Sequence, residues 1–207
     1  MPTGQRYGGK TADERRAERR ERLLEVGLEQ FGTTGYAGTS IEALCTASHL
    51  NPRYFYESFP TREALLRAVY DRHMERLAAA VVGVLAEAPL DPRARCEAGL
   101  RAFVELQRSE QRGARITYLE IVGVSLDLER HRRGVLRGFA ELLAHEADRV
   151  ADAGLIPRRD HALTALALGG AVDGLLTDCF TNEAPPSTDA IVTTLVDLFV
   201  AAFTRPA

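Results

Sequence analysis

The chain has 207 residues, of which 45% are hydrophobic and 27% charged, a composition that excludes a disordered or fibrous protein. Its three cysteines are odd in number and far apart, which argues against a disulfide framework or a thiolate zinc site, and we expect no metal or other cofactor. The net charge of −3 hides an asymmetry: residues 1–22 carry seven basic and four acidic side chains, whereas residues 71–207 carry 16 basic and 20 acidic ones. A basic end on an acidic body is typical of a protein that presents one surface to phosphates.

We expect residues 1–12 to form a flexible arm, because they contain several glycines and show no apolar periodicity. The first 22 residues lack the apolar run of a signal peptide. The longest apolar stretch, Ala165 to Val172, is much shorter than the ~20 residues of a membrane-spanning helix. We therefore expect a cytoplasmic protein that makes no contact with a membrane.

From Asp13 onward, apolar residues recur at spacings of four and three, which predicts a first helix. Its apolar stripe is formed by Leu24, Leu28 and Phe31. Gly32 and Gly35 are expected to end it.

Two short helices follow. The first, from Ile41 to Ser48, is expected to be capped by the hydroxyl of Thr39 or Ser40, which can accept from an unpaired backbone N–H of the first turn. The second runs from Pro52 to about Ser58, because Asn51 is a good N-cap and proline suits the first helical position. Two short helices about three residues apart predict a helix-turn-helix, whose second helix has the size to enter the DNA major groove.

A long helix of about 27 residues, from Thr61 to Ala88, spans roughly 40 Å and can connect two domains mechanically. Three helices with periods near 3.6 and a final apolar pair complete the chain. Their expected ranges are Pro92 to about Arg112, Arg115 to Val124, Glu129 to Ala153, Asp160 to Phe180 and Thr188 to Thr204. No segment alternates as a strand does, so the sequence predicts an all-α fold.

The run from Leu50 to Leu65, LNPRYFYESFPTREAL, resembles the recognition helix of the TetR family of bacterial transcription regulators and the start of the helix behind it. The residues that carry the resemblance are Tyr56, Phe59, Thr61, Arg62 and Glu63, together with the lead-in from Gly35 to Ile41. The match spans about residues 20–70, and beyond it only the number and lengths of the helices agree. His49 departs from the pattern where glycine is usual, and Ser58 where histidine is common.

The resemblance implies a homodimeric regulator, most simply a repressor that leaves its double-stranded DNA operator when a small-molecule effector binds. It divides the chain into the arm at 1–12, a three-helix DNA-binding domain at 13–60, and a helical bundle at 61–207 for ligand sensing and dimerisation. We expect a ligand to move the tail of the long helix, and the head of that helix, which supports the recognition helix, to follow.

Arg53 and Tyr54 lie in the first turn of the expected recognition helix. There arginine can bond guanine bidentately and tyrosine can meet a thymine methyl or a phosphate, so these two are expected to set sequence preference. Other expected DNA contacts lie on the same helix or at helix N-termini, where phosphates are readily bound: Thr39, Ser40, Asn51, Pro52, Tyr56, Thr61 and Arg62. The alternatives are that Ser40 and Thr61 are caps alone and that Tyr56, like Phe59, is a core aromatic.

The resemblance places a ligand pocket in the bundle, between about residues 92 and 153. The sequence marks it only by aromatic or polar groups on otherwise apolar faces. These candidates are Phe103, Gln107, Tyr118, Phe139 and Asp173. Asp173 is the strongest of them, because an unpaired buried carboxylate is costly. Each also fits an ordinary core or surface position, and Asp173 also fits a dimer seam or a helix cap.

The last two helices have more apolar surface than one small domain can cover, so we expect a second copy to cover it in a four-helix interface about a two-fold axis. Small residues would permit close helix approach. The expected interface consists of Leu166, Gly169, Gly170, Asp173, Ile191, Leu195, Leu198, Phe199 and Ala202. The alternative is a hairpin fully buried within a monomer.

Two other function classes are open. The run from His145 to Arg149 begins like an H-E-x-x-H zinc motif but lacks the second histidine, and phosphate-loop and nucleophile-elbow patterns are absent, so we do not expect an enzyme. A helical adaptor that binds protein through the apolar C-terminal helices is the stronger alternative. Salt separates it from a DNA-binding protein, because DNA binding weakens steeply as salt rises.

Overall fold

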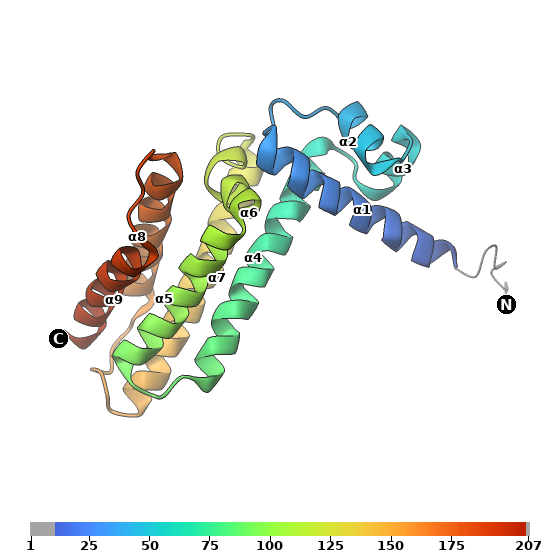
Figure 1. The fold of residues 1–207 in the computed structure, drawn as a ribbon. Helices are drawn as coiled ribbons and strands as arrows, with labels where there is room; N and C mark the ends of the chain where they lie inside the picture. Colours follow the sequence, from blue (N-terminus) through green and yellow to red (C-terminus); the bar gives the residue numbers. More distant parts are fainter. Residues whose placement is uncertain (1–10, 206–207) are drawn as a thin grey trace, which may run out of the picture.

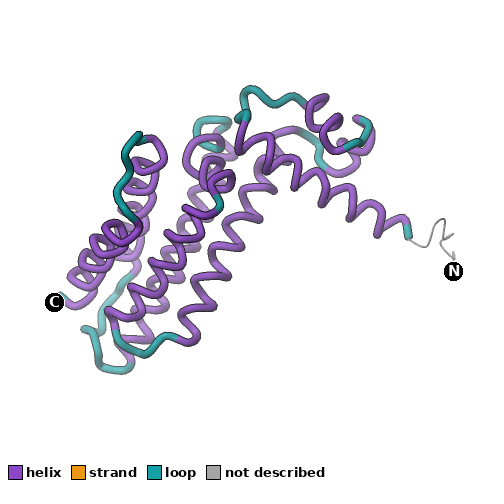
Figure 2. Tube along the Cα trace, in the orientation of Figure 1, coloured by secondary structure: helices purple, strands orange, loops and turns teal. Residues whose placement is uncertain are grey.

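The computed structural model describes residues 11–205, and over that range every element is helical and no strand is present (Figure 2). The all-α prediction is therefore confirmed. Most of the expected flexible arm, residues 1–10, lies outside the described residues, as do residues 206–207.

Helix α1 (Ala12–Thr33) begins with a capping box. The Thr11 hydroxyl accepts from the backbone N–H of Glu14 at 3.2 Å, and the Glu14 carboxylate accepts from the backbone N–H of Thr11 at 2.6 Å. Two donors at the helix start are thereby satisfied, so the helix already contains Ala12, which the sequence assigned to the arm. Gly35, at a φ of 90°, lies just beyond its end.

Helices α2 (Ile41–Ser48) and α3 (Pro52–Ser58) have the predicted bounds. His49 makes the turn between them in the left-handed conformation, at a φ of 53° and a ψ of 37°. This is the position where glycine, which has no Cβ, is the easier residue.

The long helix α4 (Arg62–Glu87) leads from α3 into the bundle. The rest of the bundle consists of α5 (Pro92–Ser109), α6 (Gln111–Arg115), the π-helical turn η1 (Ile116–Glu120), α7 (Leu126–Asp152), α8 (Ala162–Thr181) and α9 (Thr188–Thr204). Figure 1 shows α4, α5 and α7 side by side, with α1 to α3 at one end of them and with α8 and α9 along the far side.

The helix expected from Arg115 to Val124 has the wrong bounds. The helical structure runs from Gln111 to Glu120 instead and is separated from α5 at Glu110, which has a φ of −102° and a ψ of 59°. Gly123, at a φ of 74°, lies in the turn that follows. A residue at positive φ cannot continue a right-handed helix, which explains why the chain turns there.

The buried core of the N-terminal helices continues into the bundle. Leu23 of α1 and Phe55 of α3 belong to the same buried cluster as Leu65 of α4 and Ile116 of η1. A second cluster joins α5, α7, α8 and α9. This first cluster contains buried residues from both sides of the boundary expected after residue 60. The division of the chain into two domains at that point stays a prediction.

Candidate functional site

Helix α3 is anchored by two aromatic side chains and open on its other side. Phe55 and Phe59 have exposed fractions of 0% and 3%, so Phe59 is a core residue, as expected. In contrast, Tyr56 is 56% exposed, and the side chain of Arg53 is 83% exposed. The helix therefore offers its leading turn and one face to solvent, as insertion into a major groove requires.

The start of α3 is fixed by a side-chain cap. Asn51 and Pro52 are both exposed, and the carboxamide oxygen of Asn51 accepts from the backbone N–H of Tyr54 at 3.1 Å. Proline at the first helical position leaves no backbone N–H unpaired there. The predicted cap is confirmed, while contacts of these two residues with DNA stay a prediction.

Tyr54 is less accessible than the sequence indicates. It lies half-buried between α3 and α1, and the guanidinium carbon of Arg19 lies 4.4 Å from the centroid of its ring, a cation–π contact. Glu57 accepts from Nε of Arg53 at 3.0 Å and lies 3.6 Å from a guanidinium nitrogen of Arg19. Sequence reasoning did not single out Arg19, because a contact between two helices leaves no local pattern.

Thr39 does not lie at the surface. It is 1% exposed, and its hydroxyl donates to the backbone carbonyl of Gly35 at 2.7 Å. Its own carbonyl accepts from the guanidinium of Arg62, which also lies 4.1 Å above the ring of Tyr36. The expected phosphate contact of Thr39 is therefore wrong for this structure. Arg62 instead ties the start of α4 to the loop before α2.

Ser40 and Thr61 are exposed caps. The Ser40 hydroxyl accepts from the backbone N–H of Ala43 at 3.1 Å, and the Thr61 hydroxyl accepts from that of Ala64 at 3.0 Å. Capping is therefore confirmed for both residues. Their expected contacts with phosphates stay predictions.

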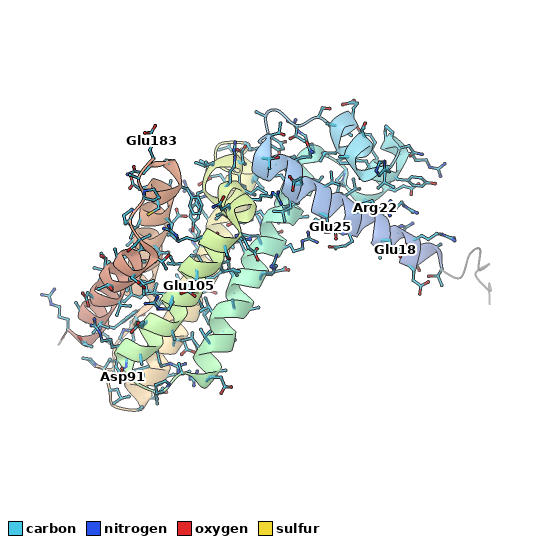
Figure 3. The ribbon with its side chains drawn as sticks, in the orientation of Figure 1. Glu18, Arg22, Glu25, Asp91, Glu105 and Glu183 are labelled. Carbon is cyan, nitrogen blue, oxygen red and sulfur yellow. The ribbon has the colours of Figure 1, made fainter. Side chains whose placement is uncertain are left out.

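Helix α1 carries many charged side chains. Figure 3 shows three exposed ones along its length, Glu18, Arg22 and Glu25. The guanidinium carbon of Arg20 lies 4.6 Å from the centroid of the Phe59 ring. Part of the basic excess predicted for the N-terminal end therefore lies directly beside α3.

The bundle contains a cavity of about 160 Å³ between α4, α5, η1, α7, α8 and α9. Four of the five predicted ligand-binding residues line it: Phe103, Tyr118, Phe139 and Asp173. Gln107 does not line the cavity but lies behind its wall, where its amide nitrogen donates to the hydroxyl of Tyr118 at 3.1 Å. The sequence thus identified aromatic and polar residues of the lining but missed most of its aliphatic residues. The expected range, about residues 92–153, was too narrow, because α4, α8 and α9 also line the cavity.

The ionic groups of the cavity wall are paired. Arg95, 5% exposed, donates to Glu146 at 2.5 and 3.1 Å. Asp173 accepts from a guanidinium nitrogen of Arg132 at 3.2 and 3.3 Å. Burial raises the pKa of the Cys96 thiol to about 11, so the cavity contains a neutral thiol at pH 7. Among residues 11–205, no three His, Cys, Asp or Glu side chains gather as metal ligands would.

A buried hydrogen-bond chain leads from the cavity wall to α4. Tyr118 accepts from Gln107, and the carboxamide oxygen of Gln107 lies 2.9 Å from Nε2 of His73. The other ring nitrogen of His73 lies 3.3 Å from the carboxylate of Glu110, at the junction of α5 and α6. A Cβ on Gly113 would lie 2.3 Å from this ring, so glycine is required for the close approach of α6 to α4.

Helix α8 leaves much of its apolar surface uncovered. Leu163 and Leu166 are 79% and 46% exposed, and Gly170 and Gly174 continue the same side of the helix at helical spacing. Among the described residues, α8 is also the one helix long and apolar enough to cross a membrane by length and composition, a test that core and interface helices of soluble proteins pass as well.

The predicted dimer residues fall into two groups. Leu166, Gly170 and, on α9, the 45% exposed Leu198 lie at the surface. The others are buried in the protomer's own core, are half-buried, or face the cavity: Ile191, Leu195, Phe199, Ala202, Gly169 and Asp173. For Ile191, Leu195 and Phe199 the interface prediction is wrong. Helix α9 packs against α5, so these side chains fill the bundle of a single protomer.

Residues 23–69, which contain the second half of α1, α2, α3 and the start of α4, match the model of a family described as bacterial regulatory proteins, tetR family. This confirms the resemblance read from residues 20–70.

Solved regulators share the fold over most of their length. The fatty acid degradation regulator FadR from Bacillus halodurans matches with a TM-score of 0.77 at 17% identity, over 88% of this chain and 94% of that chain. FadR from Bacillus subtilis in complex with stearoyl-CoA matches with a TM-score of 0.77 at 15% identity, over 88% and 98%. AibR in complex with isovaleryl coenzyme A and operator DNA matches with a TM-score of 0.64 at 17% identity, over 91% and 100%.

Proposed function

We propose that this chain is a ligand-responsive transcription regulator that binds operator DNA through α3 and is released from it by a small-molecule effector. The observation that carries the proposal is the exposed face of α3, with Arg53 and Tyr56, inside the segment that matches the tetR family model. A repressor released by its effector is the simplest version of this function, and the cytoplasm is its place of action.

Operator binding calls for two copies of the chain, because one small helix-turn-helix binds weakly and a dimer can meet two half-sites about one helical turn apart. The exposed side of α8, with Leu166 and Gly170, supports a homodimer formed about a two-fold axis. A dimer interface at α8 also accounts for the apolar character of this helix without a membrane.

The effector is proposed to occupy the bundle cavity. Two of the structurally similar regulators were solved with acyl thioesters of coenzyme A, and one of these structures also holds operator DNA. For this chain, the aromatic and aliphatic lining of the cavity supports a small-molecule site.

Helix α4 supplies the mechanical link. Its first residue, Arg62, holds the loop before α2, while Val81 and Leu85 near its other end line the cavity. An effector that moves the cavity end of α4 would shift α3 and so change the spacing of the two α3 helices in a dimer. It can weaken DNA binding only by as much as it prefers the non-binding arrangement.

Selection of genomic DNA tests the proposal. Sheared DNA from the source organism is passed over the immobilised protein, and we expect retention of a fragment that adjoins the protein's own gene. Affinity for that fragment is then measured for a variant with Arg53→Ala and Tyr56→Ala, both exposed, and for Arg130→Ala, a similarly exposed arginine on α7, as the matched control.

The double variant should lose about 2 kcal/mol or more of DNA-binding free energy, roughly 30-fold in affinity, because each good base contact contributes ~1–3 kcal/mol. The control should bind like the wild type. Equal affinity of all three proteins would refute the role of α3. Binding that does not weaken as salt rises would favour the protein-binding adaptor instead.

A further inference from the structure

The cavity is long and lined mainly by hydrocarbon. Helix α4 contributes Met74, Val81 and Leu85, and the first and last of these lie about 16 Å apart along the helix at 1.5 Å per residue. Opposite them, Phe103 of α5 and Phe139 of α7 meet edge to face, with ring centroids 5.6 Å apart. Such a lining favours an elongated apolar occupant.

The cation in the wall is not available to a ligand. Besides its two bonds to Glu146, the Arg95 guanidinium donates to the backbone carbonyls of Ala88 at 2.9 Å and Leu85 at 3.0 Å. Four of its five N–H donors are therefore used within the protein. A carboxylate or phosphate that entered the cavity would have to displace Glu146, which pairs with Arg95 and also with Arg149 at 2.9 Å.

The carboxylate on the other side of the cavity is also part of an ion pair. The Asp173 carboxylate faces Arg132, so an ammonium group would have to compete with a guanidinium that is only 15% exposed. The Cys96 thiol is neutral, and the Thr117 hydroxyl donates to the backbone carbonyl of Gly113 at 3.0 Å. The described residues of the lining thus offer a ligand hydrogen-bonding groups but no unpaired charge of either sign.

We propose that the effector is an uncharged, elongated, mainly apolar molecule, of the class of long-chain esters and alcohols, rather than an organic acid or an amine whose charge enters the cavity. Burying an unpaired charge costs far more than burying a polar group that finds a hydrogen bond, and opening a buried ion pair leaves its other member unpaired. This inference rests on the proposed function, because it names the ligand of the same regulator.

Titration calorimetry with probes of one chain length tests it. The probes are methyl decanoate, decan-1-ol, decanoate and decylammonium at pH 7. We expect the ester and the alcohol to bind at least about tenfold more tightly than each charged probe, since tenfold corresponds to only a small part of the cost of an unpaired buried charge. A charged probe that binds as tightly as the ester overturns the proposal.

Two variants locate the binding. Gly99 lines the cavity, so Gly99→Leu should abolish ester binding, whereas Gly134→Leu on the outer side of α7, where a Cβ would touch nothing, should bind like the wild type. Glu146→Gln keeps the hydrogen-bond acceptor but frees the charge of Arg95, so decanoate should gain about tenfold relative to methyl decanoate. Ester binding that survives in a folded Gly99→Leu protein, or no gain for decanoate in Glu146→Gln, contradicts the proposal.

The DNA affinity of each ligand-free variant is measured alongside. If the probes fail while the genomic fragment still binds through Arg53 and Tyr56, only the ligand class is wrong. If no fragment is bound at all, the regulator function itself fails.

Discussion

Gln107 is the buried group that joins the cavity wall to α4, and its replacement by leucine should cause a measurable loss of stability. The side chain is 0% exposed and bonds both Nε2 of His73 and the hydroxyl of Tyr118. Leucine leaves these two groups without their partner, at about 1–3 kcal/mol for each buried group. We expect Gln107→Leu to lower the free energy of unfolding by about 2–4 kcal/mol, or the melting temperature by roughly 5–15 °C for a chain of this size.

Urea denaturation at one fixed protomer concentration measures the effect, because the stability of a dimer depends on concentration. Gln111→Leu makes the same chemical change on the exposed side of α6 and should stay within about 0.5 kcal/mol of the wild type. The double variant His73→Leu, Gln107→Leu should cost less than the sum of the two single changes, because it removes both partners of one bond. A Gln107→Leu protein as stable as Gln111→Leu refutes the reasoning.

Three further results are expected. Glu57→Gln should release Arg53 from its carboxylate partner and raise affinity for the retained DNA about twofold or more, in line with a surface pair of ~0.5 kcal/mol; weaker binding in fluorescence anisotropy would contradict this. Gly170→Arg should yield a monomer in light scattering, and Gly134→Arg should stay dimeric, since a Cβ at either position meets nothing within 4 Å in one protomer; a dimeric Gly170→Arg would contradict an interface at this side of α8. Because burial raises the pKa of Cys96 to about 11, its thiolate is scarce below that pH. Its alkylation in the folded protein should therefore accelerate only as the pH approaches 11, whereas in urea it should do so near the usual value of ~8.5.

Local patterns in the sequence were enough for the N-terminal helices. Caps and punctuation act within a few residues, so Ser40, Asn51 and Pro52 determined the bounds of α2 and α3 correctly. The bounds of the helix expected from Arg115 to Val124 were wrong because the break at Glu110 and the turn at Gly123 depend on backbone angles. Apolar periodicity does not record these angles.

Local sequence patterns did not predict which side chains contact one another in the folded chain. The sequence placed Thr39 at a helix start but could not show that its hydroxyl turns inward to Gly35. It identified the last two helices as strongly apolar, yet the packing of α9 on α5, which buries Ile191, depends on which elements meet in space. For the same reason, the contact of Arg19 with the Tyr54 ring became visible only in the folded chain.

Hydroxyl-radical footprinting of the retained genomic fragment is the most direct test of the central claim that two copies of α3 read DNA. We expect two protected patches centred about one helical turn, or a multiple of it, apart, and we expect both to fade together in the variant with Arg53→Ala and Tyr56→Ala. A single patch, or protection that is unchanged in this variant, would contradict the account.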